Sequence, residues 1–180
     1  MTEEIVKAPG GTLAQRLADK MVHGAVNVGP AKGTLLLDIS GSMFDLAEPS
    51  VSKIDALRKI VNMLNPKRTF VFSDSCWEIQ GKNVPNPQMD TWYSRAFEVV
   101  KASGATDCVM VTDGIPSDPL QALEAVRGLR LEIIYVGPEP RPTYLDDLAR
   151  ACGGSIATAS LAAAKQLQLA AKIRGLLTQG

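Results

Sequence analysis

The sequence predicts an α/β protein with a doubly wound, mostly parallel central sheet and helices on both faces. Short apolar runs alternate along the chain with longer segments in which apolar residues recur at helical spacing. Strands that alternate with helices in this way form parallel sheets, because each helix returns the chain to the edge where the next strand begins. The length of 180 residues is enough to bury one substantial core, so we expect one main domain.

Turn and capping residues set the expected limits of each element. Residues 1–29 read as a polar lead-in with one amphipathic helix, whereas residues 30–180 are expected to form the α/β domain. Ser52 and Asp55 resemble a capping box, and Asp118 before a proline is a typical helix start. The expected strands are residues 34–38, 69–74, 76–80, 108–112, 131–136 and 155–158, and the expected helices are residues 13–23, 53–64, 91–103, 119–128, 143–153 and 161–177.

Composition argues against several classes of function. The 19 basic and 19 acidic residues balance, so charge gives no reason to expect binding to nucleic acid or to an anionic membrane. The N-terminus lacks the apolar core of a secretory signal, and no run reaches the length of about 20 apolar residues that a membrane-spanning helix needs. Three widely spaced cysteines and the single His23 argue against a zinc site, disulfides or a histidine-based nucleophilic mechanism. We therefore expect a cytoplasmic protein.

Oxygen-bearing side chains follow two of the predicted strands. Asp38 ends an apolar strand and precedes Ser40 and Ser42, with Gly41 between them to permit a tight loop, and a later strand is followed by Asp113. Ligands bind beyond the carboxyl ends of strands in such sheets, so we expect these groups to meet. Two carboxylates and two hydroxyls suit Mg²⁺, or Mn²⁺ or Ca²⁺, better than zinc or copper. Each residue alone could equally be a cap or a turn former, so the prediction depends on their combination.

These motifs resemble those of the von Willebrand factor A family, whose members carry a metal-ion-dependent adhesion site. Residues 35–43, Leu-Leu-Leu-Asp-Ile-Ser-Gly-Ser-Met, match the first motif of that family, in which an aspartate and two serines hold the metal. Residues 109–114 resemble its later strand, whose aspartate usually acts through a water, and residues 70–74 resemble its second strand. The resemblance covers about residues 34–160 and implies a Rossmann-like fold.

The family also supplies a threonine ligand from a loop between these two motifs, at the start of a helix. Thr91 fits best, since it follows a loop and opens the helix expected over residues 91–103, although it could simply cap that helix. The sequence departs from the family here, because Met89 and Asp90 stand where glycines are usual. Thr106 is a rival, but it precedes a strand and so would lie at the opposite edge of the sheet. Asp90 is an extra acid near the site, and a surface or capping role explains it more simply.

The resemblance implies binding rather than catalysis. Ser40, Ser42 and Thr91 would be neutral ligands, while Asp38 and Asp113 would act through waters or by orienting hydroxyls. An open coordination position would then accept a Glu or Asp carboxylate from a partner protein. Small members of the family often work beside AAA+ ATPases of the MoxR type, so such an ATPase is an expected partner.

Three alternatives stay open at this point. A Mg²⁺-dependent phosphohydrolase of the haloacid dehalogenase type also has an acid after its first strand, but it needs a second acid where this chain has Ser40. A dinucleotide-binding enzyme would need Gly-x-Gly-x-x-Gly after that strand, where the charge of Asp38 has the wrong sign for a pyrophosphate. The third alternative is a scaffold of the same fold that binds partners without metal.

Overall fold

The computed structural model describes residues 33–179, and all of them belong to one unit, Ala31–Gly180. The lead-in, the helix expected over residues 13–23 and His23 lie outside the described residues, and the domain boundary expected at residue 30 stays a prediction. Within the described residues, no helix is long and apolar enough to cross a membrane.

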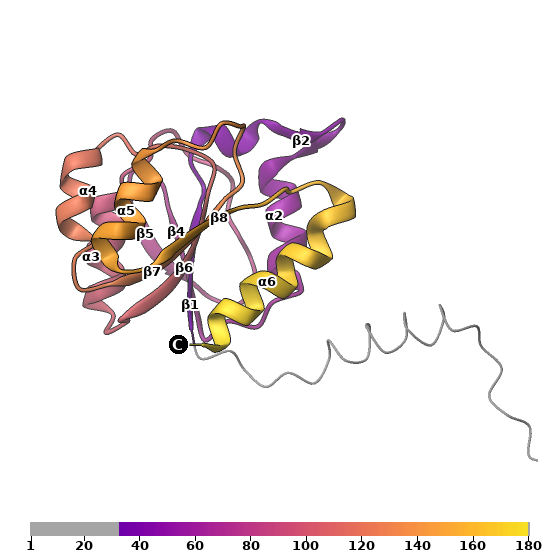
Figure 1. Cartoon of the computed structure of the whole chain (residues 1–180). Helices are drawn as coiled ribbons and strands as arrows, with labels where there is room; N and C mark the ends of the chain where they lie inside the picture. The colour runs from indigo at the N-terminus through magenta and orange to yellow at the C-terminus, as the bar shows by residue number, and fades with distance from the viewer. Residues whose placement is uncertain (1–32, 180) are drawn as a thin grey trace, which may run out of the picture. The chain divides into compact units, whose positions relative to one another are not determined.

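A six-stranded sheet forms the centre of this unit and confirms the predicted α/β fold class (Figure 1). Its strands, in spatial order, are β5 (Cys76–Ile79), β4 (Arg68–Phe72), β1 (Thr34–Asp38), β6 (Asp107–Thr112), β7 (Arg130–Tyr135) and β8 (Ser155–Thr158). Every neighbouring pair is parallel except β4 and β5. Because β1 lies between β4 and β6, its carboxyl end opens onto the same edge of the sheet as theirs.

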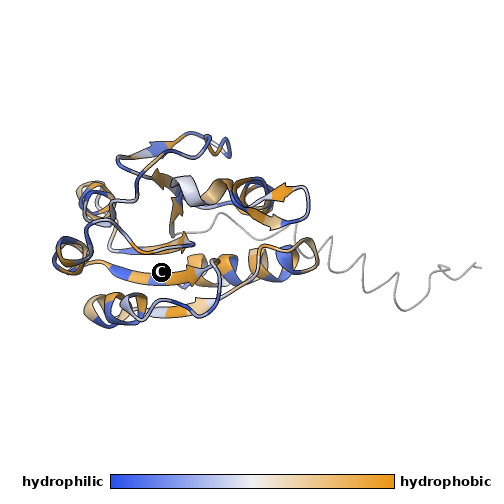
Figure 2. Ribbon diagram, turned by 90° about the horizontal axis from the view of Figure 1, so that it is seen from above, coloured by the Kyte–Doolittle hydropathy of each residue, from blue (hydrophilic) through white to orange (hydrophobic). Residues whose placement is uncertain are grey.

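Helices cover both faces of the sheet, as the doubly wound prediction requires. Two of them, α2 and α6, pack on one face, and the other three pack on the opposite face (Figure 1). The helices are α2 (Lys53–Asn62), α3 (Tyr93–Ala102), α4 (Pro119–Ala125), α5 (Tyr144–Cys152) and α6 (Gln166–Thr178). Figure 2 shows apolar segments in the strands, whereas apolar and polar residues alternate along the helices. This alternation is expected of helices that bury only one side.

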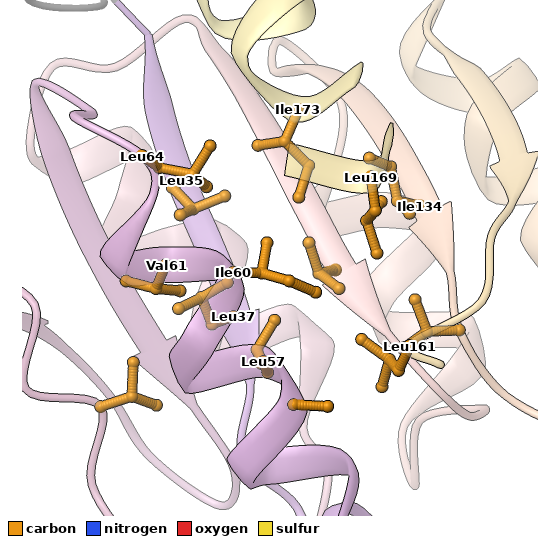
Figure 3. Packing of buried hydrophobic residues seen from close by; sticks show 14 of the residues in the cluster. Leu35, Leu37, Leu57, Ile60, Val61, Leu64, Ile134, Leu161, Leu169 and Ile173 are labelled. Atoms are coloured by element: carbon orange, nitrogen blue, oxygen red, sulfur yellow. The ribbon is translucent and has the colours of Figure 1, made fainter. Parts of the chain in front are cut away.

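The two hydrophobic clusters meet at β1. Leu35 and Leu37 face α2 and α6, where they lie near Ile60 and Ile173 (Figure 3), and Leu36 faces the cluster of the other three helices. All three leucines of β1 are 0% exposed. Burial of a leucine contributes about 1.5–3 kcal/mol. Burial on both faces explains why this strand reads as a continuous apolar run rather than an alternating one.

Several boundaries differ from the prediction. The strand expected over residues 69–74 ends at Phe72, and the helix expected from residue 161 begins at Gln166, after the short 3-10 turn η2 (Ala163–Lys165). The side chain of Gln166, the first residue of this helix, is buried and donates a hydrogen bond to the carbonyl of Leu161 at 3.0 Å, which ties the helix to the segment before the turn. A 3-10 turn, η1 (Gly41–Phe44), and a hairpin of β2 (Leu46–Glu48) and β3 (Val51–Ser52) were not predicted, because their short strands carry no apolar alternation.

The helix starts predicted at Ser52 and at Asp118 before Pro119 are both confirmed, but the Asp118 side chain caps a different helix. Ser52 caps α2, and its Oγ accepts a hydrogen bond from the backbone N–H of Asp55. Asp118 precedes α4, but its side chain makes no capping bond to that helix. Its carboxylate instead accepts hydrogen bonds from the backbone N–H groups of Tyr93 and Ser94, both at 2.9 Å, and so caps α3 from a distant loop. The tertiary fold therefore decides which helix this carboxylate caps.

Candidate metal centre

Asp38 lies at the carboxyl end of the central strand β1 and is 0% exposed. One carboxylate oxygen accepts the backbone N–H of Ser40 at 2.8 Å, and the other accepts the hydroxyl of Thr112 at 2.6 Å. The pKa of Asp38 is raised from 3.8 to about 6, chiefly by burial and then by the charge of Asp113, whereas these hydrogen bonds oppose the rise. Asp38 therefore holds the loop and the end of β6 together instead of facing solvent.

Ser40, Ser42 and Asp113 form a continuous chain of oxygen atoms. The two serine Oγ atoms lie 3.1 Å apart, and the hydroxyl of Ser42 donates to Oδ1 of Asp113 at 2.7 Å. Ser42 is exposed, whereas Ser40 and Asp113 are buried, so the chain leads from the core to the surface. Ligand oxygens of an octahedral Mg²⁺ lie about 2.1 Å from the ion, which places neighbouring oxygens roughly 3 Å apart. The observed separations fit neighbouring positions around one such ion.

Lys53 is part of this cluster, although the sequence analysis did not single it out. Its Nζ lies 2.6 Å from Oδ2 of Asp113, 3.3 Å from the carbonyl oxygen of Ser42 and 3.5 Å from Asp45. Burial acts to lower the pKa of Lys53, but hydrogen bonding and charge from Asp113 outweigh it, and the pKa is raised. Asp113 thus has a protein cation on one oxygen and a candidate ligand hydroxyl on the other.

The loop that carries Thr91 lies against the first motif. The backbone N–H of Gln88 donates to the carbonyl of Ile39 at 2.7 Å, and a Cβ placed on Gly41 would lie 3.3 Å from the carbonyl oxygen of Met89. A side chain at position 41 would therefore press on the backbone of this loop, which favours glycine there. Asp90 is exposed in the same loop.

Thr91 itself lies beside the cluster without joining its hydrogen-bond chain. Its carbonyl accepts the backbone N–H of Ser117 at 2.7 Å, which ties this loop to the one that follows β6. Within residues 33–179, no hydrogen bond links its hydroxyl to Asp38 or the serines, so its role as a ligand stays a prediction. It does not cap α3, because that helix begins at Tyr93 with Trp92 as its N-cap. The rival Thr106 precedes β6 at the opposite edge of the sheet, where its hydroxyl donates to Asp107.

A network of buried hydrogen bonds holds the residues of the cluster in place. The hydroxyl of Tyr93 lies 2.7 Å from that of Thr112 and donates to the carbonyl of Gly114 at 2.8 Å. Tyr93 is 0% exposed, so these bonds are shielded from water. The network fixes Thr112, which in turn holds Asp38, and it anchors the loop that carries Asp113.

The donor set is rich in hydroxyls and has few carboxylates. Among the described residues, no group of three or more His, Cys, Asp or Glu side chains is placed to hold a metal ion. Cys76, Cys108 and Cys152 are free thiols, and burial raises the pKa of Cys76 to about 12. The side chains of the cluster offer hydroxyl and carboxylate oxygens, which are the type of ligand that Mg²⁺ and Ca²⁺ accept.

The arrangement of strands and helices can be compared with solved structures. A "von Willebrand factor type A" protein from Catenulispora acidiphila superposes with a TM-score of 0.62 at 14% identity, over 84% of this chain and 42% of that one. The chain has a von Willebrand factor A-type fold. The hypothetical protein BatB from Bacteroides thetaiotaomicron superposes with a TM-score of 0.54 at 15% identity, over 84% of this chain and 100% of that one. The RO (RSR) protein of Deinococcus radiodurans superposes with a TM-score of 0.55 at 14% identity, over 86% of this chain and 36% of that one.

These likenesses establish the fold alone, because the identities are low. The chain spans less than half of the Catenulispora and Deinococcus proteins. No family model matches the sequence, and no curated protein matches it.

Part of this cluster at the edge of the von Willebrand factor A-type fold is predictable from the sequence. The structure brings together Asp38, Ser40, Ser42 and Asp113, which follow strands that prove to be neighbours. It adds Lys53, whose one sequence signal is a positive charge at the first position of a helix, where the helix dipole disfavours it.

Proposed function

We propose that this chain is a protein-interaction module that captures a Glu or Asp side chain of a partner through Mg²⁺, with Mn²⁺ or Ca²⁺ as substitutes. The observation that carries the proposal is the chain of oxygens from Ser40 through Ser42 to Asp113 at the exposed edge of the sheet. A bound Mg²⁺ would supply an open coordination position for a carboxylate oxygen. Ser40 and Ser42 would be neutral ligands, and Thr91 would complete the set.

The buried groups prepare these hydroxyls for binding. Asp38 accepts the backbone N–H of Ser40 and thereby orients the loop, and Asp113 accepts the proton of the Ser42 hydroxyl and leaves its lone pairs for a cation. Because the nearest ligands are neutral, a cation here keeps most of its positive charge. An acidic side chain of a partner is therefore the group that this site would attract most strongly.

Apolar side chains around the site favour a protein as the partner. Phe44, Met89 and Ile115 are 58%, 91% and 53% exposed, and each lies on a different loop beside the cluster. These loops meet, as shown by the approach of Met89 to Gly41 and by the Thr91–Ser117 hydrogen bond. Exposed apolar residues around a polar centre are typical of protein interfaces, where they become buried on binding. An AAA+ ATPase of the MoxR type is the partner class that the family resemblance implies.

A scaffold that binds partners without metal is the second candidate. The Lys53–Asp113 ion pair favours it, because Lys53 already neutralises one carboxylate of the cluster. The phosphohydrolase alternative has less support, since the hydroxyl of Ser40 stands where the second catalytic acid would be needed. A phosphatase assay with Mg²⁺ addresses the latter directly, because turnover would favour the enzyme.

The test combines metal binding with partner binding on the full chain. We expect Ser42→Ala to weaken Mg²⁺ binding at least tenfold by calorimetry, and Thr91→Val to weaken it if its hydroxyl is a ligand. Ser75→Ala is the matched control, since Ser75 is exposed on a neighbouring loop and its hydroxyl donates to Asp74, outside the cluster. A partner with an acidic binding segment should be retained in Mg²⁺ and released by EDTA. Retention in EDTA, together with normal retention by Ser42→Ala, would refute the metal bridge and favour the scaffold.

A further inference from the structure

Two electrostatic effects, the helix dipole and burial, disfavour a positive charge at the position of Lys53. It is the first residue of α2, near the positive end of the helix dipole, and only 9% of the residue is exposed. A buried ammonium group is costly unless it is paired and hydrogen bonded. Conflicts of this kind between local preference and fold concentrate at functional sites.

Every donor of this ammonium group has an acceptor in the candidate metal centre or beside it. The three acceptors are Asp113, the carbonyl of Ser42 and Asp45, at 2.6, 3.3 and 3.5 Å. Two of them belong to residues that would hold the metal. Lys53 thus supplies positive charge at the place where a divalent cation would supply it.

We infer that Lys53 is an internal cation that competes with the divalent ion for Asp113 and keeps metal affinity low, an inference that rests on the proposed function. Asp38, Asp113 and Lys53 together carry one net negative charge, whereas the two carboxylates without the lysine carry two. A divalent cation bound beside Asp113 would be repelled by the ammonium group, unless that group moves away.

A groove beside the site has room for the ammonium group of Lys53 when a metal ion displaces it. The groove has a volume of about 680 Å³ and is lined by Lys53, Asp45 and the segments that follow β7 and β8. The side chain of Asp45 is 70% exposed and already lies 3.5 Å from Nζ. Rotation of the flexible lysine stem toward Asp45 would keep an ionic partner and hydrate the ammonium group. The site would then exchange between a state closed by Lys53 and a state loaded with metal.

Metal affinity and stability provide the first test. We expect Lys53→Met to bind Mg²⁺ at least tenfold more tightly than the wild type by calorimetry. In EDTA its melting temperature should fall, because Asp38 and Asp113 lose their counter-ion, and Mg²⁺ should restore it. Lys59→Met is the matched control, since Lys59 lies exposed on the same helix. Equal or weaker Mg²⁺ binding by Lys53→Met would overturn this inference alone, whereas no Mg²⁺ or Mn²⁺ binding by either protein would overturn the metal centre as well.

A second measurement uses the wild-type chain and does not depend on whether the variant folds. Acetylation of lysines by an N-hydroxysuccinimide ester, followed by peptide mass spectrometry, reports how free each ammonium group is. We expect saturating Mn²⁺ to increase the acetylation rate of Lys53 several-fold and to leave that of Lys59 unchanged. A Lys53 rate that stays constant or falls while Mn²⁺ is bound would show that the ion does not displace the lysine, and would refute the inference.

Discussion

Replacing Asp38 with asparagine should stabilise the metal-free protein while removing its metal binding. Asparagine has nearly the same shape as aspartate, so its Oδ1 can still accept the N–H of Ser40. Its Nδ2 can donate to the hydroxyl of Thr112, which reverses the direction of the present hydrogen bond. The substitution therefore removes a buried negative charge and keeps both contacts.

The expected size follows from the pKa of Asp38, which burial and the charge of Asp113 raise from 3.8 to about 6. Below about pH 3 the carboxyl group is protonated in both the folded and the unfolded chain, so it does not affect stability. Between about pH 4 and 6 the unfolded chain loses the proton first, and the free energy of unfolding falls as the pH rises. Above pH 6 the full penalty, about 3 kcal/mol, is present. Asparagine carries no such penalty.

Urea denaturation of the wild type and Asp38→Asn, after metal has been removed, measures this effect. We expect the difference in the free energy of unfolding to grow in favour of Asp38→Asn by about 3 kcal/mol between about pH 3 and pH 7.5. The change with pH is the decisive quantity, because altered hydrogen bonding contributes a term that does not depend on pH. A difference that stays constant between these pH values, or that grows in favour of the wild type, would refute the reasoning. With saturating Mg²⁺ the wild type should regain stability and Asp38→Asn should not.

Three further substitutions test the framework of the site, each by urea denaturation. Asp118→Ala removes the acceptor of two N–H groups at the start of α3 and should lower the free energy of unfolding by about 1–3 kcal/mol. A loss below about 0.5 kcal/mol would show that the cap is dispensable. Leu57→Ala leaves a cavity in place of a side chain that is 0% exposed, and it should lower the free energy of unfolding by about 2–5 kcal/mol. Gly154→Ala would push a Cβ into the backbone of Leu131 and should cost more than about 2 kcal/mol. Gly175→Ala, where a Cβ meets nothing, is its control and should gain up to about 1 kcal/mol; equal effects of the two glycine changes would contradict the packing argument.

Part of the fold and of the candidate site was predictable from sequence because the signals are local. The apolar run at Leu35–Leu37 marks a strand buried on both faces, and Ser52 marks a helix start by its spacing to Asp55. The von Willebrand factor A-type resemblance then implied a Rossmann-like fold, but the strand order came from the structure. The hairpin of β2 and β3 escaped prediction, since strands of three and two residues have no periodicity to detect.

The sequence by itself determined the α/β alternation and the cluster of oxygens after β1, because hydrophobic period and turn chemistry act over a few residues. Only the tertiary structure decided which distant groups meet those oxygens. Lys53 reaches Asp113 across 60 positions, and Asp118 caps a helix 25 positions before it. Such contacts depend on strand order and on the paths of loops, and no local pattern carries that information. The charge of Lys53 is visible in the sequence, but its place beside Asp113, on which the behaviour of this site depends, is a property of the fold.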